Sequence, residues 1–389
     1  TYKTISITIG RVLFGFSAAL VLGTLIGVAT VNKSIELLLR PTLLIMQGVP
    51  PILWSIPLIL ILGFSRLAPI TVISLICFPL VATNISEGMQ TIPPELKEML
   101  AVYAPGFKAR FRELILPHLK PFLAASIRLG LGIGIKASVI AEYFAANDGI
   151  GFQIQTAYQA FLIRKLFSWA LVLILVILLF DFALRRLSLL IRRKPTALSA
   201  VSATELGKPE SLLSGRPANV PGEIVIRDIS FGYGHSAPLF QGVNVEVGPE
   251  EMMVISGDSG TGKTSLLKVI AGLVPPSGGS VSGPDLVGFM FQDDRFLPWF
   301  DNMRNVGLPL LYQGRSRRES EMQAGLLLEQ VGLEDWKRSY PAELSGGMKK
   351  RLAFARSFAC MPGALLLDEP FTGLHHDARA KLWALFGDL

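Results

Sequence analysis

The sequence predicts a multi-domain protein in which an all-α transmembrane bundle is followed by an α/β domain. Half of the 389 residues are hydrophobic and only 17% are charged, a composition too apolar for an ordinary soluble domain. Long apolar stretches fill residues 1–193, whereas alternating strand patterns begin at Glu223 and continue toward residue 389. Between them, residues 194–222 are rich in Pro, Ser and Gly and predict a flexible linker.

Five stretches in the first part are apolar enough to cross a membrane, which takes about 20 helical residues. They cover residues 12–31, 43–62, 67–85, 121–144 and 166–184. The second stretch holds Gln47 and three prolines, which transmembrane helices tolerate where neighbours satisfy the freed carbonyls. A buried helix of a soluble domain is the alternative for that stretch alone.

The charge distribution separates the two parts. Residues 1–195 hold 19 Lys and Arg against 8 Asp and Glu, and the remainder holds 18 against 22. Because cationic loops collect on the cytoplasmic side of a membrane, residues 97–120 and 185–194 are expected there, and Thr1 outside. The basic excess thus indicates membrane lipid and not nucleic acid as the partner. Two cysteines and four histidines without Cys-x-x-Cys spacing argue against a disulfide framework or a zinc site.

The connection between the third and fourth stretches, near residues 87–120, carries a spaced motif. Glu98 is followed at fixed spacing by Ala104 and then by Leu116 and Pro117. This pattern resembles the EAA loop of binding-protein-dependent ABC permeases, with Ala104 in place of the glycine. In that family the loop docks on the ATPase, so the resemblance implies a coupling loop. A cationic connector with chance spacing is the alternative.

Two ionisable residues, Lys136 and Glu142, lie within or near the fourth stretch. Ionisable groups at membrane depth are costly and face a cavity or a partner, which makes both candidates for a substrate pathway. At about 100° per residue they lie on different helix faces, so a direct pair is not expected. Snorkelling of Lys136, or a structural partner elsewhere, is the alternative.

The strongest motif is a complete G-x-x-x-x-G-K-[ST] loop between the strand-like residues 252–256 and a helical pattern over 265–273. Its backbone N–H groups are expected to cradle phosphates, while Lys263 neutralises their charge and Thr264 offers its hydroxyl to Mg²⁺. The predicted phosphate-binding residues are Gly257, Asp258, Ser259, Gly260, Thr261, Gly262, Lys263, Thr264 and Ser265.

An apolar strand over residues 364–367 ends in an acidic pair, Asp368 and Glu369. After a phosphate-binding loop, this pattern places Asp368 near Mg²⁺ and Glu369 where a base polarises the attacking water. The second part of the chain is therefore predicted to be an α/β P-loop NTPase domain.

Two further glycines, Gly346 and Gly347, lie between Ser345 and Met348 and open a predicted helix, where the backbone can approach a phosphate. The segment resembles the LSGGQ signature of ABC ATPases, with Met348 in place of the glutamine. That resemblance implies ATP as cofactor. It also implies that Tyr233 stacks on adenine and that Gln292 touches Mg²⁺ and water beside the catalytic Glu369. An ordinary turn aromatic is the alternative for Tyr233.

Nearly the whole chain resembles a type I ABC importer permease fused to its own ATPase, of the nitrate, sulfonate and taurine group. Residues 1–193 match the permease and residues 223–389 the ATPase, and the turn at 148–151 and the Leu-Pro-Trp at 297–299 fit this group. The resemblance implies ATP-driven import of a small anion across the cytoplasmic (inner) membrane, with the ATPase in the cytoplasm. It also implies an extracytoplasmic substrate-binding protein and a homodimer, or a second permease and ATPase.

Alternatives to anion import remain. One is import of a thiamine-pyrimidine type of vitamin precursor by a similar permease, and the other is a non-hydrolysing, nucleotide-binding membrane regulator. Two departures from the family pattern bear on the second. His375 occupies the position of the D-loop aspartate, and no switch histidine follows before Leu389. The chain is expected to be truncated at both ends, or else degenerate.

Overall fold

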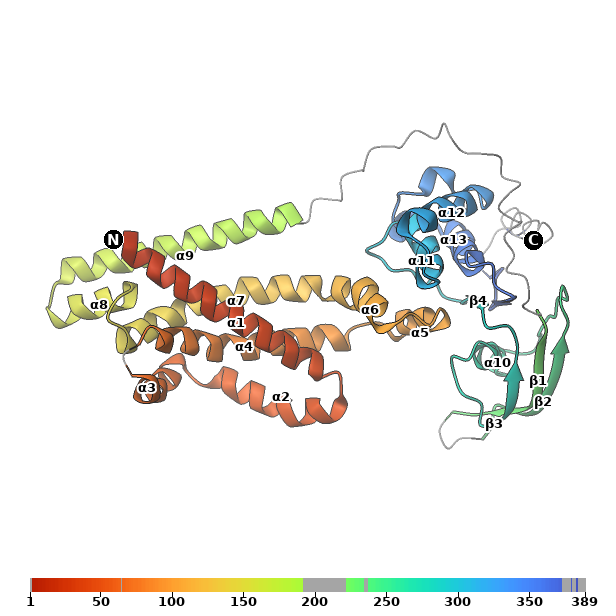
Figure 1. Ribbon diagram of the computed structural model, residues 1–389, viewed down its shortest axis with the longest axis horizontal. Helices are drawn as coiled ribbons and strands as arrows, with labels where there is room; N and C mark the ends of the chain where they lie inside the picture. Colours follow the sequence, from red (N-terminus) through yellow and green to blue (C-terminus); the bar gives the residue numbers. More distant parts are fainter. Residues whose placement is uncertain are drawn as a thin grey trace. The chain divides into compact units, whose positions relative to one another are not determined.

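The computed structural model describes residues 2–63, 65–191, 222–233 and 237–372, together with Arg379 and Trp383 (Figure 1). The chain forms two compact units. One contains residues 1–92 and 115–202, and the other contains residues 93–114 and 203–389. The segment 93–114 lies in the apolar part of the sequence but packs with the α/β part. The predicted linker and His375 lie outside the described residues.

The first unit is a helix bundle. Its helices are α1 (Tyr2–Ala29), α2 (Lys33–Gly48), α3 (Pro51–Leu62), α4 (Leu67–Gln90), α7 (Leu116–Ala145), α8 (Ile150–Gln159) and α9 (Ile163–Ile191). In the described part, four helical stretches are long and apolar enough to cross a membrane, and they include α1, α4, α7 and α9. The third, fourth and fifth predicted stretches lie within these helices, and the first, residues 12–31, extends two residues beyond the end of α1.

The second predicted stretch, residues 43–62, is not one continuous helix. Helices α2 and α3 meet at 95° and form a fifth span only if the bent pair crosses the membrane together. The break falls at Val49 and Pro50, where Val49 is extended with a ψ of 124°. Proline donates no backbone hydrogen bond and disfavours helical geometry in the residue before it, which ends α2.

Small residues let α1 and α4 approach closely along their length (Figure 1). Gly15, Gly23 and Gly27 are spaced so that they share one face of α1. A Cβ at Gly23 would lie 2.6 Å from the Cβ of Val81, and one at Gly27 would lie 2.7 Å from that of Ile85. Membrane helices associate by such close packing because lipid offers no hydrophobic driving force between them.

The second unit combines short helices of the predicted coupling loop with an α/β domain. Its elements are α5 (Pro94–Val102), α6 (Phe107–Arg110), the π-helical turn η1 (Phe111–Ile115, whose last residue belongs to the first unit), β1 (Ile224–Phe231), β2 (Phe240–Val247), α10 (Lys263–Ile270), β3 (Gly278–Ser282), β4 (Val287–Met290), α11 (Asn302–Tyr312), α12 (Arg317–Gln330), the 3₁₀ turns η3 (Glu334–Trp336) and η4 (Pro341–Glu343), α13 (Gly346–Phe358) and β5 (Ala364–Leu367). Strand β1 pairs antiparallel with β2 and β3, whereas β4 pairs in parallel with β5. Residues of α11, α12 and α13 bury one apolar core with Met290 of β4.

The predicted strand over residues 252–256 is wrong for this structure, because the segment has no regular secondary structure. Its apolar side chains are exposed, with Met252 at 63% and Val254 at 79%. A strand needs a hydrogen-bonded neighbour, and among the described strands β5 pairs only with β4. The predicted helix after the loop is present as α10, but it ends at Ile270 instead of residue 273.

Candidate functional site

The predicted catalytic residues meet at one edge of the β4–β5 pair. The two strands are parallel, with Met290 opposite Leu367, so the segments that follow them leave at the same edge. Gln292 follows β4 and Glu369 follows β5, and the Gln292 Nε2 donates to the Glu369 Oε2 at 2.9 Å. The parallel register therefore explains why residues so distant in sequence share a site.

Glu369 is held in an uncommon backbone conformation. Its φ is +47°, in the left-handed region that side chains other than glycine rarely adopt. The Thr372 hydroxyl donates to the same Oε2 at 3.1 Å. Such strain is concentrated at functional sites, and here it accompanies the residue that the sequence predicts to be the base.

The phosphate-binding loop has the geometry that its glycines allow. Gly262 has a φ of +95° and immediately precedes α10, which begins at Lys263. The Lys263 Nζ donates to the carbonyl oxygens of Gly257 and Asp258 at 2.7 and 2.6 Å, so its ammonium lies over the loop. A cationic group beside a helix N-terminus is suited to binding a phosphate.

Two of the three predicted Mg²⁺ ligands, Thr264 and Asp368, lie side by side. The Thr264 hydroxyl donates to the Asp368 Oδ1 at 3.0 Å. Burial raises the pKa of Asp368 above the usual range of aspartate, and the hydrogen bond from Thr264 opposes that shift. A hydroxyl and a carboxylate are hard oxygen donors of the kind Mg²⁺ prefers, and Mg²⁺ commonly takes its remaining ligands from water and phosphate. The pair therefore fits the predicted metal.

The other predicted nucleotide contacts divide between two places. The Tyr233 hydroxyl lies 3.3 Å from the Ser265 Oγ of α10, and the residue is 54% exposed. Ser345 caps α13, accepting from the Met348 N–H at 3.4 Å. Among the hydrogen bonds of the described residues, none joins 345–348 to the loop 257–264.

The coupling-loop residue Glu98 binds the α/β domain through two cations. The Arg295 Nη1 donates to Glu98 Oε2 at 2.7 Å, and the Lys268 Nζ donates to Oε1 at 3.2 Å. Burial raises the pKa of Glu98, but the hydrogen bonds from Arg295 and Lys268 outweigh it and hold the pKa below the usual range of glutamate. Lys268 belongs to α10, which follows the phosphate loop, and Arg295 follows Gln292 closely. Glu98 therefore contacts two segments that carry residues of the nucleotide site.

A second attachment joins Glu113 to α11 and the segment before it. The Arg304 Nη2 donates to Glu113 Oε2 at 2.6 Å, and the Trp299 Nε1 donates to the Glu113 carbonyl at 3.0 Å. The Arg304 guanidinium also lies 3.5 Å from the centre of the Phe300 ring. Sequence reasoning did not find Glu113, Arg304, Arg295 or Lys268. Only their opposite charges hinted at pairing, and charge does not say which residues meet.

The other two coupling-loop residues, Leu116 and Pro117, belong to the first unit and form the first turn of α7. Proline is well tolerated there, because the first N–H groups of a helix have no partner within it.

Ala104 occupies the position of the glycine in the EAA pattern, and its backbone adopts a conformation that favours glycine. Its φ is +43°, a left-handed conformation that costs a residue with a Cβ about 1–2 kcal/mol. Part of that cost is offset by the greater entropy of glycine in the unfolded chain. We expect Ala104→Gly to stabilise the second unit by about 0.5–1 kcal/mol. Thermal unfolding of the full chain checks this, with Ala101→Gly inside α5 as a destabilising control. A lower melting temperature for Ala104→Gly contradicts it.

Glu142 is fully buried in the first unit and both of its carboxylate oxygens have partners. The Arg11 Nη1 donates to Oε1 at 3.0 Å, and the Thr8 hydroxyl and the Gly151 N–H donate to Oε2 at 2.9 and 3.1 Å. The Arg11 Nη2 also binds the Asp148 Oδ1 at 2.5 Å. This network joins α1, α7 and α8, which favours a structural role for Glu142 over a pathway role.

The turn at residues 148–151 is shaped to fit this network. Gly149 has a φ of +101°, and a Cβ there would lie 2.4 Å from the Glu142 carboxyl carbon. Lys136 is exposed and is not part of this network. This agrees with the expectation that Lys136 and Glu142 lie on different faces of the helix. Sequence reasoning missed Arg11, which lies directly before the first predicted stretch, although an arginine at membrane depth is itself a signal of a buried partner.

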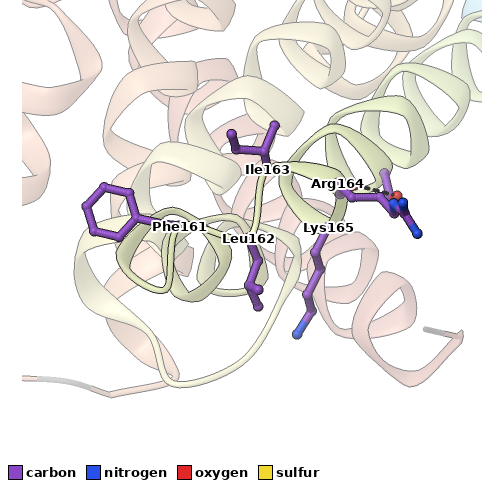
Figure 2. A pocket seen from close by; sticks show the side chains of 6 residues that line it. Phe161, Leu162, Ile163, Arg164 and Lys165 are labelled. Carbon is purple, nitrogen blue, oxygen red and sulfur yellow. Dashed lines mark hydrogen bonds between the residues drawn. The ribbon is translucent and has the colours of Figure 1, made fainter.

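A hollow of about 490 Å³ lies at the turn between α8 and α9 (Figure 2). Leu162 and Lys165 point to the same side, and Phe161 points away from them (Figure 2). The hollow is lined by Phe161, Leu162, Ile163, Arg164, Lys165 and Ser168. Cationic and aromatic residues at the end of a span are typical of the membrane interface, and none of the predicted site residues lines it.

Comparison with known protein families identifies the class of protein. Residues 19–193 match the family described as binding-protein-dependent transport system inner membrane component, and residues 240–372 match the ABC transporter family. The chain combines a permease domain of the binding-protein-dependent transport systems with an ABC transporter domain. The predicted order, a permease followed by an ABC ATPase domain, is confirmed, and with it the multi-pass membrane class.

The curated relatives of this chain are named as ATP-binding proteins. The taurine import ATP-binding proteins TauB of Pseudomonas syringae pv. tomato and of Pseudomonas entomophila are 41% and 40% identical over 160 residues. Each alignment covers 39% of this chain, which spans 61% and 62% of the two relatives. The solved dimer of the ATP-binding cassette MJ0796 bound to ADP and Pi is 27% identical, with a TM-score of 0.40, and the match covers 43% of this chain and 82% of that one.

Proposed function

We propose that this chain uses ATP hydrolysis to import a small anion of the sulfonate class, to which taurine belongs. The observation that carries the proposal is the attachment of residues 93–114 to the ATPase domain within one compact unit. Glu98 of this segment binds both α10 and the segment after Gln292. The names of the TauB relatives support the substrate class.

The residues of the nucleotide site supply the parts that hydrolysis needs. The loop 257–264 would hold the phosphates, with Lys263 exchanging its two carbonyl partners for phosphate oxygens. Thr264 and Asp368 would hold Mg²⁺, which neutralises phosphate charge when bound. Glu369 accepts the proton of the attacking water, and Gln292 fixes the orientation of that carboxylate.

The attachment of residues 93–114 transmits movement at the hydrolysis site to this segment. Because Glu98 is bonded to Lys268 of α10, a shift of α10 on nucleotide binding displaces the whole segment. Because Ser345–Met348 make no hydrogen bond to their own phosphate loop, two chains related by a two-fold axis would complete each other's sites. The ATPase domain lies in the cytoplasm of this arrangement, and a substrate-binding protein delivers the anion from the other side of the inner membrane.

The proposal is tested with the full-length protein in lipid vesicles. ATPase activity is measured with a substrate-binding protein that is empty or loaded with taurine, nitrate or a thiamine pyrimidine. Stimulation by the taurine-loaded protein supports sulfonate import. Stimulation by the loaded pyrimidine alone overturns the substrate class, and ATP binding without turnover in every condition overturns transport in favour of a regulator.

Glu98→Gln is expected to uncouple the two units. The amide keeps the shape of the side chain but leaves Arg295 and Lys268 without their anion. We expect the stimulation of ATPase activity by loaded binding protein to fall about fivefold or more, the lower end of typical coupling between sites. The matched control is Glu95→Gln on the exposed face of the same helix. Wild-type stimulation of the Glu98→Gln variant contradicts the assignment.

A further inference from the structure

The place where residues 93–114 meet the ATPase domain holds an unusual group of unsatisfied polar atoms. In the described part of the chain, seven buried side-chain nitrogen or oxygen atoms have no hydrogen-bond partner. Five of them gather here: Tyr103 Oη, Arg295 Nε, Arg304 Nε, Tyr312 Oη and Arg356 Nε. A buried polar atom without a partner costs free energy, so such a cluster calls for a functional explanation.

Tyr103 is the residue that 93–114 inserts into this cluster. It follows α5 directly and is buried, and burial raises the pKa of its hydroxyl to about 12. The hydroxyl is therefore neutral at physiological pH and available as both donor and acceptor. Its neighbour is the Arg356 guanidinium, which lies close enough to oppose this rise in pKa, but neither the Tyr103 Oη nor the Arg356 Nε has a hydrogen-bond partner of ordinary geometry.

Arg356 connects this neighbour to the nucleotide site. It lies on α13, the helix that the signature segment opens, and is only 1% exposed. Its Nη1 donates to the Arg295 carbonyl, and its guanidinium lies 4.8 Å from the centre of the Phe296 ring. The same helix holds the Gln292 carbonyl through Lys350. Arg356 therefore fixes the segment of Gln292 against the signature helix.

We propose that Arg356 is a positioning residue for ATP hydrolysis whose place is set by Tyr103 of the coupling loop. The unpartnered Tyr103 hydroxyl and Arg356 Nε give the contact two arrangements, one open as described here and one hydrogen-bonded. A small shift of residues 93–114 converts one into the other, which moves the Gln292 segment and α13 together. This inference rests on the proposed function, because it assigns a route between the loop and the hydrolysis site.

The test follows hydrogen exchange in the full chain carrying Glu369→Gln, embedded in lipid nanodiscs, with and without MgATP. In this parent, MgATP is expected to slow exchange in peptides from residues 99–106 and 346–358 by about fivefold, as for typical coupled sites. Adding Tyr103→Phe removes only the hydroxyl. We expect it to leave the affinity for ATP unchanged and to reduce this slowing to less than about twofold in both peptides.

Tyr312→Phe is the matched control, because it removes another unpartnered hydroxyl of the same cluster, on α11. It is expected to retain the full slowing. In an Arg356→Lys background, Tyr103→Phe is expected to have no further effect. Full slowing in Tyr103→Phe, or equal losses in both tyrosine variants, overturns the role of Arg356. A parent that binds no ATP instead refutes the proposed function, and the inference with it.

Discussion

Replacing Glu369 by Gln is expected to lower the ATPase rate of the full chain about 10²- to 10⁴-fold, the usual contribution of a general base. The amide keeps the shape of the side chain and can still contact Gln292, but it no longer accepts a proton from water. The phosphate loop and the Thr264–Asp368 pair are untouched, so MgATP affinity is expected to stay within about twofold. Phosphate release and equilibrium nucleotide binding measure the two quantities separately.

A surface carboxylate of the same unit provides the control for that variant. Glu334→Gln, in the exposed turn η3, is expected to hydrolyse ATP at the wild-type rate. If Glu369→Gln also retained the wild-type rate, the assignment of Glu369 as the base would be refuted. A parallel loss of MgATP binding would instead show that the substitution damages the site as a whole.

Replacing Arg11 by Met is expected to destabilise the first unit by about 3–5 kcal/mol, the typical cost of breaking a buried ion pair from one side. Arg11 is 5% exposed and Glu142 is fully buried, so the variant leaves an uncompensated carboxylate inside the bundle. Asp148 loses its partner as well, which loosens the turn that carries Gly149 and Gly151. Met fills much of the volume of Arg, so the loss reports mainly on charge and hydrogen bonding.

Thermal unfolding of the purified chain in detergent measures this effect, and two further variants interpret it. The double variant Arg11→Met/Glu142→Gln is expected to recover part of the loss, because the remaining side chain is neutral. Arg128→Met breaks an exposed pair with Asp181 at 3.8 Å and is expected to cost only about 0–1 kcal/mol. An Arg11→Met variant as stable as wild type would return Glu142 to the candidates for the substrate pathway.

The features that sequence reasoning predicted correctly are local. The phosphate loop depends on glycines and a lysine within eight positions, and the helix predicted after it is present as α10, which begins at Lys263, two residues earlier than predicted. The apolar spans follow from length and composition, which decide whether a helix is stable in lipid. The acidic pair after β5 and the helix after Ser345 follow from the same kind of short-range pattern.

One expectation failed where a local pattern depends on a distant partner. Residues 252–256 have the apolar composition of a strand, but a strand exists only when another strand pairs with it. Composition does not predict this outcome, since it carries no information about which neighbours are within reach. Residues 43–62 have the composition of a span, and Pro50 and Pro51 divide them into α2 and α3, which form a fifth span if the bent pair crosses the membrane together.

The sequence by itself determined the order of the two parts, the membrane helices, the phosphate loop, the acidic pair and the signature segment. Only the tertiary structure decided that residues 93–114 pack with the ATPase domain, that Glu98 binds Arg295, and that Arg11 neutralises Glu142. The physical reason is the separation along the chain over which each interaction acts. Backbone propensity and hydrophobic periodicity act over a few residues, whereas these ion pairs join side chains that are far apart in the chain and meet only after the elements have packed.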